Sequence, residues 1–232
     1  MLTNFYRYII IYNDRITKGA VKMEKLPDKY TTVRTEAHVE FEEKRSLFIG
    51  HATHVDSEEE AQAFIKQLKK EYSDATHNCY AYLLKGGIIA RYSDDGEPQG
   101  TAGVPMLETI RKSGVDDVCV VVTRYFGGIL LGAGGLVRAY SHSTAIAIEG
   151  AEIITYEPYL IYELRSGYSE YQKYINILTN YGVIIDDTVF EADVCVRFAV
   201  KRDRVKSLID KILETGYGKD VPEKIGERFD YR

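Results

Sequence analysis

Residues 118–142 read VCVVVTRYFGGILLGAGGLVRAYSH, and this stretch joins three patterns with different meanings. The apolar, β-branched run at 118–122 predicts a buried strand. Apolar residues that recur at helical spacing after Gly135 predict a helix ending at residues 149–150. Five glycines lie between these elements. Because glycine loses more conformational freedom on folding than any other residue, such a cluster needs a structural or functional reason.

The glycine cluster allows two interpretations. A strand, a glycine turn and a helix N-terminus together form an anion site, where free amides and the positive end of the helix dipole converge. The candidate residues for such a site are Gly127, Gly128, Gly132, Gly134 and Gly135, with Arg124, Arg138 and His142 beside them. The dinucleotide and Walker fingerprints are both broken, because Val137 and Ala133 stand where those motifs need other residues. The alternative is that the glycines allow close packing of the backbone.

The composition limits the class of protein. The 232 residues carry a net charge of −5 and are 45% hydrophobic, which suits one large or two ordinary domains and argues against general nucleic-acid binding. Cys79, Cys119 and Cys195 are far apart and form no CxxC pair, so we expect reduced thiols in the cytoplasm rather than a disulfide framework or zinc site. No apolar run approaches the ~18 residues of a membrane span, so no membrane partner is expected.

The chain divides into three parts. Residues 1–22 show no periodicity and precede Met23, so we expect a mis-assigned start or a disordered extension. Residues 23–150 predict strands at 38–55, a helix capped by Ser57, strands at 78–84 and 88–92, and a helix ending near Gly114. Residues 151–232 predict the order β-α-β-β-α-β, with Ser169 capping the first helix, which is typical of a ferredoxin-like sandwich.

A second candidate site is the acidic loop, SDDGEPQGTAGVPM at residues 93–106. Asp94, Asp95 and Glu97 offer hard oxygen ligands that suit Mg²⁺, especially beside a bound phosphate. Asp-Gly and Glu-Pro are equally ordinary turn chemistry, and the acids could instead pair with Arg124. No nucleophile and base are convincingly paired, and the alternation around His51 favours a solvent-facing or interface side chain. We therefore assign no catalytic residue and favour a protein that is not an enzyme.

The blocks SDDGEPQGTAGVPM and RYFGGILLGAGGLVRAYS, with KRSLFIGHATHV as a weaker third, resemble the IMPACT family in its bacterial, YigZ-like form. The resemblance covers residues 30–232 and leaves residues 1–22 outside. It implies an α+β protein of two sandwiches. The N-terminal one would have the ribosomal-protein domain-2-like fold found in domain IV of elongation factor G, and the C-terminal one would be ferredoxin-like, similar to domain V of that factor.

The resemblance also implies a role. Eukaryotic relatives regulate translation by binding a ribosome-associated co-activator of a stress kinase, so we expect a translation-linked regulatory or binding protein. Its partner would be the ribosome, RNA or a ribosome-associated protein. Motif positions add Thr101 and Tyr125 to the candidate binding residues. The alternative is an enzyme or sensor that binds a small phosphorylated ligand with Mg²⁺; the family supplies no settled catalytic residues or cofactor.

Overall fold

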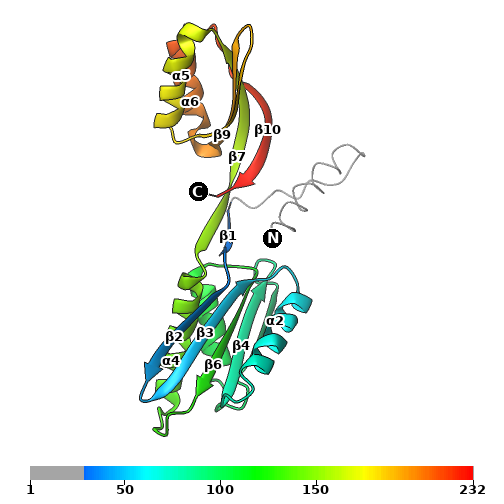
Figure 1. Ribbon diagram of the computed structural model, residues 1–232, viewed down its shortest axis with the longest axis vertical. Coiled ribbons are helices and arrows are strands. Elements are labelled where there is room, and N and C mark those ends of the chain that lie inside the picture. The colour runs from blue at the N-terminus through cyan, green and yellow to red at the C-terminus, as the bar shows by residue number, and fades with distance from the viewer. Residues whose placement is uncertain (1–28, 232) are drawn as a thin grey trace. The chain divides into compact units, whose positions relative to one another are not determined.

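The computed structural model describes residues 29–231, so the expectation for residues 1–22 lies outside it. The described chain is mixed α/β, with two five-stranded sheets and five α-helices. It forms two compact units, Tyr30–Thr155 and the described residues from Tyr156 onward. The division falls inside β7 (Ile153–Ser166), and β1 (Tyr30–Val33) lies beside the start of that strand (Figure 1). None of the described helices is both long and apolar enough to cross a membrane.

The first unit is built on an antiparallel sheet in the order β2–β3–β6–β4–β5. Its strands are β2 (Ala37–Glu43), β3 (Ser46–His54), β4 (His77–Leu84), β5 (Ile89–Ser93) and β6 (Val118–Tyr125). The apolar run at 118–122 is the central strand β6, as the sequence predicted. Val118, Val120 and Val122 enter one core, whereas Cys119 and Val121 enter another. The sheet is therefore buried on both faces.

Three helices cover these two faces (Figure 1). Helix α2 (Glu58–Glu71) packs on one face, and α3 (Gly103–Ser113) and α4 (Ala133–Gly150) pack on the other. The predicted caps are present: Ser57 Oγ accepts from the Glu60 amide at 3.2 Å, and Gly114 ends α3 with φ +73°. Helix α4 begins at Ala133, inside the glycine cluster, so Gly134 and Gly135 lie in its first turn.

The second unit follows the predicted β-α-β-β-α-β order. Its elements after β7 are α5 (Tyr168–Asn180), β8 (Ile184–Phe190), β9 (Val194–Lys201), the short η1 (Arg202–Arg204), α6 (Val205–Thr215) and β10 (Glu223–Asp230). The strands lie antiparallel in the order β10–β7–β9–β8. One predicted detail is wrong: α5 starts before Ser169, and its N-cap is Gly167, which has no side chain to form the cap.

Candidate functional site

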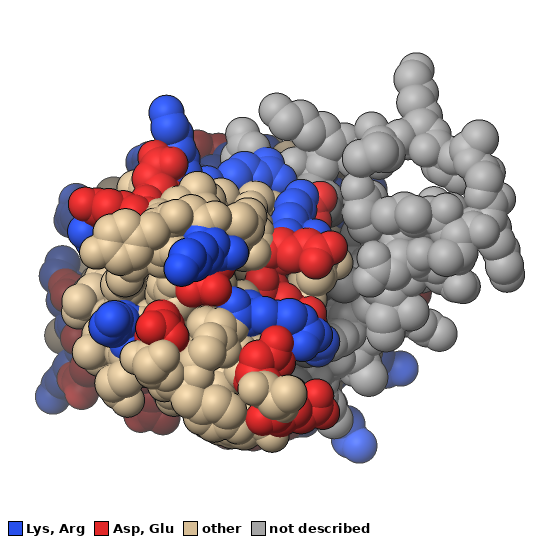
Figure 2. All heavy atoms as spheres, turned by 90° about the horizontal axis from the view of Figure 1, so that it is seen from above, with Lys and Arg blue, Asp and Glu red and all other residues tan. Residues whose placement is uncertain are grey.

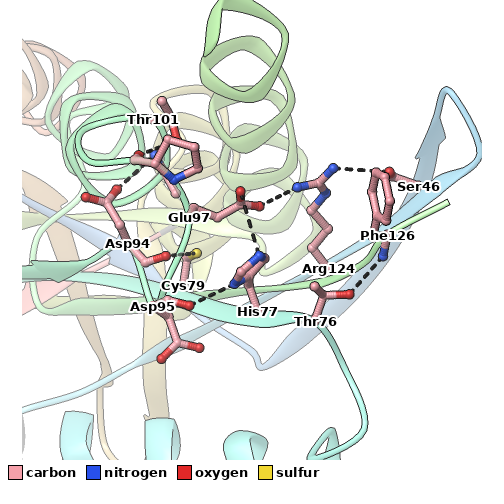
Figure 3. A network of polar contacts seen from close by, with 12 residues as sticks. Ser46, Thr76, His77, Cys79, Asp94, Asp95, Glu97, Thr101, Arg124 and Phe126 are labelled. Atoms are coloured by element: carbon pink, nitrogen blue, oxygen red, sulfur yellow. Dashed lines mark hydrogen bonds and ion pairs between the residues drawn. The ribbon is translucent and has the colours of Figure 1, made fainter. Parts of the chain in front are cut away.

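Helix α3 takes up the last residues of the acidic motif, so the acidic loop proper is residues 93–101; it and the glycine loop (residues 126–132) lie at the same end of the first sheet, where β4 begins and β6 ends. The connection is an ion pair between Arg124, at the end of β6, and Glu97, with Nη1 2.6 Å from Oε1 (Figure 3). From the sequence, this pairing was the alternative to a metal site. The two motif blocks are therefore parts of one structure.

The ion pair is inside the protein. Arg124 is 5% exposed and Glu97 is 7% exposed. The Tyr140 hydroxyl donates to the same Glu97 oxygen at 2.8 Å, and Arg124 Nη2 donates to Ser46 Oγ at 3.3 Å. The guanidinium also lies over the Phe48 ring, 5.4 Å from its centroid. Arg124 was expected to face an incoming anion, but the structure turns it inward, where it neutralises Glu97.

His77 and Cys79, both on β4, complete this network (Figure 3). His77 Nδ1 donates to the Asp95 carbonyl at 2.8 Å, which leaves Nε2 facing Glu97 Oε2 at 3.8 Å. The Cys79 thiol donates to the Asp94 carbonyl at 2.9 Å. Burial raises the pKa of this thiol far above its ordinary value. A buried thiol of this kind is a structural residue and no nucleophile.

Asp94 caps a helix from outside it. Its Oδ1 accepts from the amides of Ala102 and Gly103, at 3.0 and 2.8 Å, and its Oδ2 accepts from Gly100 at 2.8 Å. Partial burial opposes ionisation, yet these amide hydrogen bonds outweigh it and hold the pKa of Asp94 below its ordinary value. The carboxylate thus satisfies the free amides at the start of α3, which has no cap from its own N-cap residue, Ala102.

Two other polar residues of the acidic loop, Asp95 and Thr101, are also engaged. Asp95 pairs with Lys69 of α2 through Oδ1, and its Oδ2 accepts from the Asn78 amide at 2.7 Å. The Thr101 hydroxyl donates to the Pro98 carbonyl at 2.6 Å. Asp94 and Asp95 therefore face different helices. Within residues 29–231, no group of three or more His, Cys, Asp or Glu side chains is arranged to hold a metal ion.

Most glycines of the cluster have a structural reason. A methyl group at Gly127 would overlap the carbonyl of Arg45, and one at Gly135 would lie 2.9 Å from Leu131 Cβ. Gly128 and Gly132 have φ of +84° and +73°, which side chains rarely adopt. Gly134 differs, because the nearest atom to a methyl group there would be Arg138 Nη1, at 3.6 Å. Close packing or a positive φ therefore explains every glycine of the cluster except Gly134.

The surface of the glycine loop is exposed and apolar. The side chains of Phe126, Ile129, Leu130 and Val137 face solvent, and Leu130 is 82% exposed. Gly134, Arg138 and His142 are exposed on the first turns of α4, and the N-cap Gly132 gives that helix no side-chain cap. Tyr125 is held aside, since its hydroxyl donates to Asp74 at 2.9 Å. We call Phe126, Ile129, Leu130, Gly134, Val137 and Arg138 the glycine-loop surface.

The sequence analysis missed a second buried network on the other face of the sheet. His51 is fully buried, with its Nδ1 2.6 Å from Nδ1 of His38 and its Nε2 3.2 Å from Thr123 Oγ1. Thr123 in turn donates to Asn78 Oδ1 at 2.7 Å. Burial and the neighbouring His38 lower the pKa of His51 to about 4. The expectation that His51 faces solvent or an interface is wrong, because α2 covers that face of the sheet and its C-cap Tyr72 contacts the His51 ring.

Comparison with known proteins identifies the relatives of this chain. IMPACT family member YvyE of Bacillus subtilis is 37% identical over 196 residues, which cover 84% of this chain and 90% of YvyE. The chain belongs to the IMPACT family. IMPACT family member YigZ of Escherichia coli is 35% identical over 178 residues, covering 75% of this chain and 87% of YigZ.

The IMPACT assignment also covers the site. The sequence model of the Impact N-terminal domain matches residues 44–148, which contain both loops. A solved structure, "Crystal structure of an hypothetical protein", has 32% sequence identity and a TM-score of 0.54. That match covers 86% of this chain and 98% of the solved one. Similarity within the IMPACT family thus extends over both units.

Proposed function

We propose that this IMPACT family protein is a cytoplasmic, translation-linked binding protein that contacts the ribosome, and more specifically a protein component of it or bound to it. The glycine-loop surface carries the proposal. Leu130 is 82% exposed, and three more apolar side chains of the same loop and the following helix, Phe126, Ile129 and Val137, face solvent. Contiguous exposed apolar side chains are typical of protein interaction sites.

The folds supply the link to translation. We propose that the second unit, with its strand order β10–β7–β9–β8, is a ferredoxin-like sandwich similar to domain V of elongation factor G. We propose the ribosomal-protein domain-2-like fold of domain IV for the first unit. A fold alone does not imply a function, so this link is an analogy. It directs the first experiment to the ribosome.

The chemistry of the site favours binding over catalysis. Cys79 is a buried thiol with a raised pKa, and Glu97 is neutralised by Arg124. Asp94 and Asp95 each use both carboxylate oxygens within the chain. Our proposal therefore includes neither a catalytic residue nor Mg²⁺. It also sets aside the phosphorylated small ligand, because Arg124 and Lys69, the two cations that contact the acidic loop, are already paired with its carboxylates.

The charge distribution favours a protein partner over RNA. Figure 2 shows one face of the molecule, on which Lys and Arg side chains are interleaved with Asp and Glu. Ion pairs of the second unit follow the same pattern, with Arg197 2.8 Å from Glu163 and Arg228 2.7 Å from Asp186. Binding to RNA through its phosphates needs many unpaired cations. The ion-paired cations of the second unit do not provide them.

Co-sedimentation of the full chain with ribosomes tests the proposal. We expect the unaltered protein to pellet with ribosomes, and Leu130→Ser to reduce the pelleted fraction. The matched control is Ile88→Ser, which removes another exposed apolar side chain, 84% exposed, in the turn before β5. Failure of the unaltered protein to pellet under several salt and growth conditions, or equal losses in both variants, would contradict the proposal.

A further inference from the structure

The turn between β2 and β3 has an unusual backbone. Glu43 pairs with Ser46, so Lys44 and Arg45 form a two-residue hairpin turn, and their φ values are +48° and +66°. Such turns favour Asn-Gly, because both central residues must adopt the left-handed conformation. A lysine and an arginine adopt it only at a cost in stability. The hairpin by itself gives no reason for these two cations.

The same turn lies against the glycine loop. The Gly127 amide donates to Ser46 Oγ at 3.2 Å, and a methyl group at Gly127 would overlap the Arg45 carbonyl. The glycine at 127 therefore allows the turn and the loop to touch. Lys44 and Arg45 are both exposed, and the Arg45 backbone lies against Gly127, which directly follows the exposed Phe126 of the glycine-loop surface.

A third cation lies on the same side. Arg138 precedes His142 by one helical turn, and the His142 ring contacts Phe41 of β2, with centroids 4.8 Å apart. Arg138 therefore lies on the side of α4 that faces β2. Within the described part of the chain, Lys44, Arg45 and Arg138 form no ion pair. The nearby carboxylates of Glu42 and Glu43 offset only part of this charge, since they are two against three.

We propose that Lys44 and Arg45 are the charge-recognising part of the glycine-loop surface, and that its partner is a protein segment carrying acidic residues beside apolar ones. This inference rests on the proposed function and names the chemistry of the partner. The apolar side chains of the segment cover Leu130 and its neighbours, and the carboxylates pair with the turn. Complementary charge at the rim of an apolar contact adds specificity and speeds association.

A double variant distinguishes the effect of the two positive charges on binding from their effect on the stability of the turn. Lys44→Asn with Arg45→Gly removes both cations and installs the residues that the turn geometry favours, so the unfolding midpoint should rise. The probes are a fluorescein-labelled helical peptide of Leu and Glu, a matched peptide of Leu and Lys, and oligouridylate. We expect the Leu–Glu peptide to bind best, and the double variant to bind it about three- to tenfold more weakly and with less dependence on salt.

The outcomes are distinct. Preference for the Leu–Lys peptide or for oligouridylate would overturn the inference, as would a double variant that binds the Leu–Glu peptide unchanged. A rise in the midpoint with weaker peptide binding would support it. If Leu130→Ser reduces pelleting with ribosomes and the double variant does not, the proposed function stands and the inference about Lys44 and Arg45 is wrong. If the Leu–Glu peptide binds with the expected charge dependence but the unaltered protein does not pellet with ribosomes, the inference stands and the proposed function is wrong.

Discussion

The acidic loop and the glycine loop are linked through Arg124, which pairs with Glu97 and lies just before the glycine loop, yet they use their side chains in opposite ways. In the acidic loop, Asp94 accepts from two amides at the start of α3 and from the Gly100 amide before it, and Glu97 is buried against Arg124. In the glycine loop, Ile129 and Leu130 face solvent. The first loop holds the sheet end and two helices together, and the second remains available to a partner. As sequence motifs, both loops were equally good candidates for a binding site. Only the three-dimensional contacts show that the acidic loop is structural and that the glycine loop is exposed.

The largest effect should come from breaking the scaffold at Glu97. Glu97→Ala leaves the Arg124 guanidinium buried without its partner, and removing one member of a buried pair costs about 3–5 kcal/mol. Urea unfolding of the two proteins measures the difference. The control is Glu108→Ala, which removes a surface pair with Arg111 in the same unit and should cost less than about 1 kcal/mol. Equal losses in the two variants would mean that the buried pair contributes no more than a surface one.

The next largest effect concerns the buried network around His51, whose contribution to the free energy of unfolding should depend on pH. His51 has a pKa of about 4 in the folded chain and its ordinary 6.5 when unfolded. Below pH 6.5 the unfolded chain binds a proton that the fold rejects, so the free energy of unfolding should fall by up to about 3 kcal/mol between pH 6.5 and 4.

Chemical unfolding over this pH range measures the effect, and two variants assign it. His51→Gln should flatten the pH dependence, whereas His142→Gln, at an exposed position, should leave it as in the unaltered protein. A profile that keeps its slope in His51→Gln would show that another group binds the proton.

The sequence predicted the elements well and the environments of individual side chains poorly. The run at 118–122 and the Ser57 cap depend on local patterns, so the strand β6 and the start of α2 could be predicted. The burial of His51 could not be predicted. Alternation along a strand shows only that the strand has two faces, and whether the His51 face is buried depends on the packing of α2. The buried position of Arg124 also depends on a residue distant in sequence, since its partner Glu97 lies 27 residues earlier in the chain.

Within the glycine loop, Gly127→Ala should break the contact with the cationic turn. The added methyl group would overlap the Arg45 carbonyl, so the turn or the loop must shift. Inserting a methyl group where no space exists typically costs about 1–3 kcal/mol. Thermal unfolding measures the loss. A variant as stable as the unaltered protein would show that the loop and the turn are not in contact in solution.

Gly134→Ala should have the smallest effect and the opposite sign. The position is exposed in the first turn of α4, its φ is not positive, and a methyl group would meet nothing nearer than Arg138 Nη1 at 3.6 Å. Alanine favours the helix and restricts the unfolded chain, so the variant should gain up to about 1 kcal/mol. A glycine that the fold does not need suggests close approach of a partner to the helix amides. We therefore expect higher thermal stability together with weaker pelleting with ribosomes, whereas a loss of stability would return Gly134 to the packing interpretation that accounts for Gly127.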